Sequence, residues 1–179
     1  MAAGELEGYA SLFNVVDAGG DIVLPGAFVN LKDFLATGVV TWAHDMDRPV
    51  AMPIEAVDDG VGLRLRAGFH GTSDGIMARQ VLTERQSAGV SPFGLSIGYI
   101  LLQSGQDAAG HRLLRKIYLL EVGLVAMPMN FLARVSRVKG LDAAPGKALN
   151  AAELERARLL RGASRFEWGQ FLAGLAGGL

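Results

Sequence analysis

Short apolar segments recur along residues 1–139 between turn residues, and in several of them the side chains alternate between apolar and small or polar with a period of two. This pattern is typical of strands that bury one face of a sheet. It predicts strands over Glu5 to Phe13, Ile22 to Leu24, Val39 to His44, Pro49 to Val57, Val61 to Phe69, Gly94 to Gln103, Leu113 to Ala126 and Arg134 to Val138. Helical spacing predicts two helices, over Ala27 to Thr37 and from Ser73 or Asp74 to Ser87. We therefore expect an α+β, mainly β fold: a mixed or antiparallel β-barrel of about seven strands with surface helices.

The pattern changes after residue 139. Residues 140–148 contain an Ala-Ala-Pro-Gly run and predict a linker, so the barrel domain should span residues 1–139. Residues 149–179 predict a helical tail, in which Ser164 and Glu167 form a capping box. An apolar stripe follows, made of Trp168, Phe171, Leu172 and Leu175. The stripe either folds back on the barrel or docks on a partner, such as a second copy of the chain.

Composition excludes several classes of function. The 179 residues include 17 basic and 18 acidic side chains, and the basic ones form no block, so nucleic acid is not expected as a partner. The absence of cysteine excludes disulfides, thiolate catalysis and cysteine-based zinc sites. Apolar runs stay far below the ~20 residues of a membrane span, and Met1 to Glu7 does not form a signal peptide. Asp17 and Asp21 flank two glycines as turn residues rather than as a calcium loop, so no metal or cofactor is expected.

The segment from Gly94 to Gly98 fits the G-x-S-x-G pattern of the α/β-hydrolase nucleophile elbow. An elbow requires a helix directly after the serine, whereas Tyr99 to Leu102 continues as a strand. Elbow enzymes also place their acid and histidine after the serine, in that order. The elbow assignment is therefore rejected, and a general esterase is disfavoured with it.

Strand geometry accounts for the same serine differently. Side chains alternate between faces, so Ser96 shares its face with Gly94 and Gly98 and would be open to a substrate backbone. By the same alternation Glu121 shares a face with Gly123, and His44 shares one with Val40 and Trp42. A serine becomes a nucleophile when an imidazole takes its proton and a third group orients the imidazole. Ser96, His44 and Glu121 are the candidates for these roles; the alternative is an ordinary strand serine with glycines that mark bulges.

Other titratable residues are weaker candidates. His70 ends a predicted strand and His111 lies in a polar loop, so both are expected at the surface, although either could replace Glu121 as the orienting group. Asp45 follows His44 directly and would point to the opposite face if the strand continued.

Several segments together resemble the prohead maturation proteases of tailed phages, a serine protease family distantly similar to herpesvirus assemblins. The resemblance covers about Gly8 to Lys139. It is carried by Gly8 to Phe13, Asp17 to Val23, Pro25 to Phe28, Trp42 to Asp45, Gly94 to Tyr99, Leu120 to Val125 and Pro128 to Asn130. It implies a mixed β-barrel and an endopeptidase that cleaves scaffold, or the scaffold-like region of the major capsid protein, and also itself. It implies action inside immature capsids in the host bacterial cytoplasm; prophages and gene transfer agents carry the same protease type.

By motif, the resemblance makes Ser96 the nucleophile, His44 the general base and Glu121 the third member, where assemblins have a second histidine. Gly123 stands where the family commonly has a small hydroxyl residue. The arginine pair of assemblins has no match near Met127 to Met129, which leaves the oxyanion hole unassigned. The alternative function is a catalytically weak or inactive assembly factor of the same fold.

Overall fold

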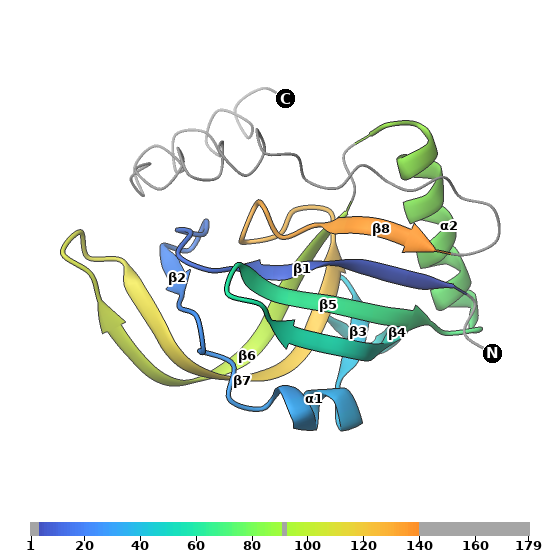
Figure 1. The fold of residues 1–179 in the computed structure, drawn as a ribbon. Coiled ribbons are helices and arrows are strands. Elements are labelled where there is room, and N and C mark those ends of the chain that lie inside the picture. Colours follow the sequence, from blue (N-terminus) through green and yellow to red (C-terminus); the bar gives the residue numbers. More distant parts are fainter. Residues whose placement is uncertain (1–3, 91–92, 140–179) are drawn as a thin grey trace.

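The structure is a computed structural model that describes residues 4–90 and 93–139. This part of the chain is mainly β, with two helices and one sheet of eight strands (Figure 1). In chain order the elements are β1 (Glu5–Leu12), β2 (Asp21–Val23), α1 (Leu31–Thr37), β3 (Val39–Trp42), β4 (Asp45–Asp58), β5 (Gly62–Phe69), α2 (Ser73–Ser87), β6 (Gly94–Gln106), β7 (Arg112–Val125) and β8 (Val135–Lys139).

The sheet is mixed, and β7 is its hub. Along one edge, β7 pairs in parallel with β2 and then with β3; along the other edge it pairs antiparallel with β6. From β3 the order continues through β4, β5, β1 and β8, all antiparallel. The expectation of a closed barrel was wrong. β8 pairs with β1, and among residues 4–90 and 93–139 its side of the sheet reaches β6 only through the isolated bridge between Gly94 and Arg134.

Twist folds this long sheet over itself (Figure 1). The β6–β7 hairpin crosses behind β1, β5 and β4, and the apolar side chains between the two layers form the core (Figure 1). Fully buried members come from both layers and include Leu6, Leu63, Leu65, Val40, Leu95, Ile117, Leu119, Val122 and Leu124. Val40, Leu95, Val122 and Leu124 are the apolar alternates of strands whose other face carries the candidate site residues.

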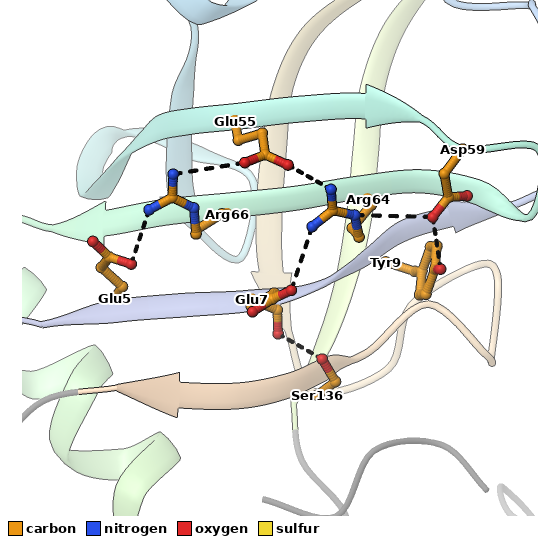
Figure 2. Close-up of polar contacts among 8 residues, drawn as sticks. All are labelled: Glu5, Glu7, Tyr9, Glu55, Asp59, Arg64, Arg66 and Ser136. Carbon is orange, nitrogen blue, oxygen red and sulfur yellow. Dashed lines mark hydrogen bonds and ion pairs between the residues drawn. The ribbon is translucent and has the colours of Figure 1, made fainter. Parts of the chain in front are cut away.

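The outer face of β1, β5 and β4 is polar (Figure 2). Arg64 on β5 contacts Glu7 on β1 and Glu55 on β4, with its shortest distance of 2.5 Å to Glu55. Arg66 repeats the arrangement one pleat further on, between Glu5 and Glu55. Cross-strand pairs of opposite charge add little free energy each, but a slip by one residue would turn these charges into the core. The network therefore fixes the register of this layer.

Helix α1 begins later than predicted. The predicted helix started at Ala27, but residues 27–29 instead bond to β7: Ile117 N donates to Ala27 O at 2.9 Å, and Val29 N donates to Ile117 O at 3.2 Å. Helix α2 matches its predicted span, except that Thr72 caps it by accepting a hydrogen bond from Gly75 N. It packs Ala78 and Leu82 against the sheet at one end of the molecule (Figure 1).

The predicted linker (140–148) and helical tail (149–179) lie outside the described residues, so the division after residue 139 stays a prediction. Within residues 4–90 and 93–139, no helix has the length and apolar character needed to cross a membrane.

Asn30 fastens the segment before α1 to β7. Its side chain is buried; Nδ2 donates to Leu119 O at 3.0 Å, and Oδ1 accepts from Leu119 N at 2.8 Å. The segment leads through α1 into β3, so this double bond helps to set where β3 lies along β7.

We expect Asn30→Ala to lower the free energy of unfolding by about 2–4 kcal/mol, because both backbone groups of Leu119 would lose their partner in a buried site. Urea denaturation measures the change. Thr37→Ala, which removes an exposed bond to Asp33 O, is the matched control and should stay within about 0.5 kcal/mol of the parent chain. A loss of similar size in both variants would contradict the role assigned to Asn30.

Candidate active site

The candidate residues lie on three neighbouring strands, on the face opposite the core. In the parallel pair, Thr41 of β3 lies beside Gly123 of β7, and Val39 lies beside Glu121. On the other edge of β7, Ser96 lies opposite Gly123 and Gly98 lies opposite Glu121. Residues in one row across a sheet point to the same face. Thr41, Ser96 and Glu121 therefore share one face, and all three are buried.

His44 reaches this face from a tight turn. Trp42 pairs with Asp45, so Ala43 and His44 form a two-residue hairpin loop between β3 and β4. Their φ angles of 54° and 64° are both positive, as a type I′ turn requires. Such turns prefer Asn-Gly, and left-handed backbone costs a residue with a Cβ roughly 1–2 kcal/mol. A histidine held in that conformation is the kind of strained residue that clusters at functional sites.

This turn corrects two predictions. The strand ends at Trp42 rather than continuing to His44, and His44 does not share the face of Val40 and Trp42. Asp45 does not continue the strand either, because it is the first residue of β4. The turn is anchored to β7 by Ala43 N, which donates to Leu124 O at 3.0 Å.

A buried carboxylate joins the turn to the sheet. Glu121 Oε1 lies 2.5 Å from His44 Nδ1, and Oε2 accepts a hydrogen bond from Thr41 Oγ1 at 2.8 Å. The side chain of Glu121 is 7% exposed, whereas that of His44 is 41% exposed. The bond assigns the proton of a neutral imidazole to Nδ1, which leaves the lone pair on Nε2. The histidine is thus oriented from the protein side and accessible from the solvent side.

The glycines on this face make room for the protein's own side chains. A Cβ on Gly123 would lie 2.8 Å from the imidazole of His44. One on Gly98 would overlap the Glu121 carboxylate, and one on Gly94 would overlap the Pro128 ring. The prediction that these glycines leave Ser96 open to a substrate backbone was therefore wrong. Ser96 is only 7% exposed, and its neighbours on the face are covered by other residues of this chain.

The remaining candidates lie apart from this group. His111 binds Asp107 at 2.8 Å in the loop that joins β6 to β7, and His70 lies between β5 and α2. Neither is bonded to His44 in the part of the chain that the structure describes. Asp17 is a turn residue as predicted, since its Oδ1 accepts from both Gly19 N and Asp21 N. Residues 4–90 and 93–139 contain no cluster of His, Cys, Asp and Glu that could hold a metal.

The prediction from the sequence did not include two residues of this region, Thr41 and Arg112. Thr41 is the only hydroxyl-bearing residue of the apolar strand β3. This could have indicated a role for Thr41 in the site, but only if His44 had been placed in a turn. Arg112 forms a bidentate ion pair with Asp21, at 2.8 and 2.5 Å, across more than ninety positions of the chain. Nothing in the local pattern of either residue indicates that pair.

Comparison with known proteins identifies the family of this chain. A family model described as the caudovirus prohead serine protease matches residues 2–145. The chain belongs to the caudovirus prohead serine protease family. The prohead protease of Enterobacteria phage HK97 is 32% identical over 150 residues, which cover 78% of this chain and 62% of that protein. This member of the family thus spans less than two thirds of the length of that relative.

A structural similarity is more distant. The crystal structure of KSHV protease in complex with a hexapeptide phosphonate inhibitor matches with a TM-score of 0.47 and 14% sequence identity, over 98% of this chain and 78% of that one.

Gly123→Ala tests the close packing of the candidate site. The added methyl group would force the imidazole away from β7, so we expect the bond between His44 Nδ1 and Glu121 to be lost. The downfield Nδ1–H proton resonance of His44 reports this bond. Gly71→Ala is the control, because a Cβ there meets open space. An unchanged resonance in Gly123→Ala would contradict the geometry.

Proposed function

We propose that this chain is a serine endopeptidase in which Ser96 is the nucleophile, His44 the general base and Glu121 the group that orients the base. The observation that carries the proposal is the imidazole of His44. It is bonded through Nδ1 to a buried carboxylate and packed on Gly123, the residue directly opposite Ser96. Membership of a serine protease family supports the same roles.

The geometry supports a two-step acyl transfer. Ser96 Oγ attacks the carbonyl carbon of the scissile peptide bond while its proton passes to His44 Nε2. The imidazolium then donates this proton to the leaving amine as the carbon–nitrogen bond breaks. Water then attacks the acyl-serine ester while His44 Nε2 takes its proton, and the imidazolium returns this proton to Ser96 Oγ as the ester bond breaks and the carboxylic acid product leaves. Glu121 stabilises the imidazolium in both steps without itself taking the proton.

Ser96 Oγ has no hydrogen bond to His44 within the described residues. Hydrogen bonds of this kind are often loose in unliganded proteases and tighten when the substrate binds. The cross-strand pairing of Ser96 with Gly123 nevertheless makes the serine and the imidazole neighbours.

The proposed substrates are proteins of the immature capsid. We infer that the enzyme cleaves scaffold, or the scaffold-like region of the major capsid protein, and that it cleaves itself. The support is family membership and the similarity to a phage prohead protease. On this view the enzyme acts inside the prohead, which would confine the protease together with its substrates.

Ser96→Ala and His44→Ala should each lower the rate of substrate cleavage, relative to the parent chain, by on the order of a millionfold. The double variant should be little worse, because a nucleophile and its base act as one unit. The measurement is co-expression with the capsid and scaffold proteins of the same genome, read as processing on a gel, together with labelling by a fluorophosphonate. Normal processing in the presence of Ser96→Ala would contradict the role of Ser96 as the nucleophile. If the fluorophosphonate also failed to label the parent chain, the inactive assembly factor would be the better account.

Glu121→Gln should lower kcat by on the order of ten-thousandfold, which is a smaller loss than in Ser96→Ala or His44→Ala. The reason for the loss is that the imidazole no longer has its charged partner or its correct tautomer. Thr41→Val removes one hydrogen bond to that carboxylate, so its expected loss is smaller, roughly tenfold to a hundredfold. Thr41→Ser keeps the hydroxyl group and should restore most of the activity.

The two remaining histidines provide the controls for this ranking. His70→Ala and His111→Ala should retain activity, because neither residue is bonded to His44 in the described chain. If Glu121→Gln were fully active while one of these histidine variants was dead, a histidine would be the orienting group instead.

A further inference from the structure

A cavity of about 120 Å³ opens beside Ser96. Both Ser96 and Ile97 contribute to its wall. Adjacent residues of a strand point to opposite faces, so a cavity that touches both must lie against the edge of β6 rather than over one face. Its other walls come from β1, from β2 and the turn before it, and from β7 and the segment after it; they include Asp17, Asp21 and Met129.

The free edge of β6 next to this cavity suits an extended peptide. Leu95 N uses the edge to donate to Ala133 O at 3.0 Å. Ile97 is the next residue with its backbone groups on that edge, and among the described residues it has no partner there. An unpaired strand edge is a site where a peptide can add as a further strand. A peptide bound in this way would pass Ser96 and present alternate side chains to the cavity.

The wall of the cavity carries a negative charge without a matching positive one. Asp21 is neutralised by Arg112, which pairs with it from outside the lining. Asp17 accepts the Gly19 and Asp21 amides on Oδ1 alone, and Oδ2 receives no hydrogen bond from the described residues. Burial is the main reason why the pKa of Asp17 is raised. A cation in the cavity would offset this cost.

Size and lining restrict the side chain that fits. A cavity of about 120 Å³ is many times the roughly 10–15 Å³ that a single water needs, so it has room for an unbranched side chain. Val15, Val23, Leu114 and Met129 supply apolar walls for a methylene stem, and Asp17 supplies a charge for its end.

We infer that this cavity is the specificity pocket of the protease and that it takes a lysine side chain of the substrate adjacent to the scissile bond. The inference rests on the proposed role of Ser96, because only then does a pocket beside it select the cleaved bond. A carboxylate in such a pocket sets the preference for a basic residue in other serine proteases.

The first test is cleavage of a positional-scanning peptide library. The parent chain should cleave peptides with lysine at one position next to the scissile bond at least roughly tenfold faster than peptides with norleucine there. Asp17→Asn keeps the Oδ1 acceptor of the turn and removes the charge, so it should abolish this ratio while norleucine peptides are still cleaved. Thermal unfolding checks that the variant is folded.

Asp107→Asn is the matched control. Asp107 also accepts two backbone amides on Oδ1, from Ala109 N and His111 N, but in the distal loop of the β6–β7 hairpin. Its variant should keep the lysine preference. Unchanged preference in Asp17→Asn, or a parent chain that prefers neutral or acidic residues, would overturn the pocket assignment while the proposed function stands.

A second test does not depend on catalysis. On the Ser96→Ala protein, n-butylammonium should shift the NMR amide signals of Gly19 and Asp21 in a saturable way, whereas 1-butanol should not. Asp17→Asn should remove the difference. Equal responses to the two probes, or no response to either, would refute the pocket even if no peptide were cleaved. If n-butylammonium gave the expected response but no Ser96-dependent cleavage were found, the result would count against the proposed function instead.

Discussion

The buried carboxylate of Glu121 is the constraint on which the arrangement of the site depends. A carboxylate removed from water is costly unless its oxygens find donors. Here one oxygen takes the Thr41 hydroxyl and the other takes the His44 ring, so both donors must come from β3 and its turn. Gly98 must also lack a side chain, because the carboxylate occupies that space. A single buried group thus determines residue choices on three strands.

The parallel pairing of β3 with β7 allows both oxygens of the Glu121 carboxylate to find hydrogen-bond donors. It places Thr41 beside Gly123 and brings the β3–β4 turn to the end of β7, where Ala43 bonds to Leu124. The Asn30 side chain and the backbone bonds of residues 27–29 hold the preceding segment along the same strand. His44 is therefore positioned largely by residues of β7: Leu124 anchors its turn, and Glu121 and Gly123 contact its ring.

Much of this architecture was predictable from alternation, because most strands bury one face. The mainly β class and the shared face of Ser96 and Gly98 follow from it, and helical spacing indicated the two helices. His44 could not be placed, since Ala-His is not a turn sequence and only the pairing of Trp42 with Asp45 reveals the type I′ loop. That error hid Thr41, whose face is opposite to the one predicted for the histidine. The open sheet was also unpredictable, because local patterns do not state that β8 pairs with β1 and not along β6.

The long separation of the paired residues orders events during synthesis. His44 and Glu121 are 77 positions apart, and Ser96 lies between them. The β3–β4 hairpin is local and can close soon after it leaves the ribosome, whereas its pairing with β7 must wait until residues near Val125 have emerged. Until then the imidazole lacks its carboxylate and the serine lacks the strand opposite it. On the proposed roles of these residues, catalysis would have to wait for the complete sheet, and a nascent chain would be unable to cleave its neighbours on the polysome.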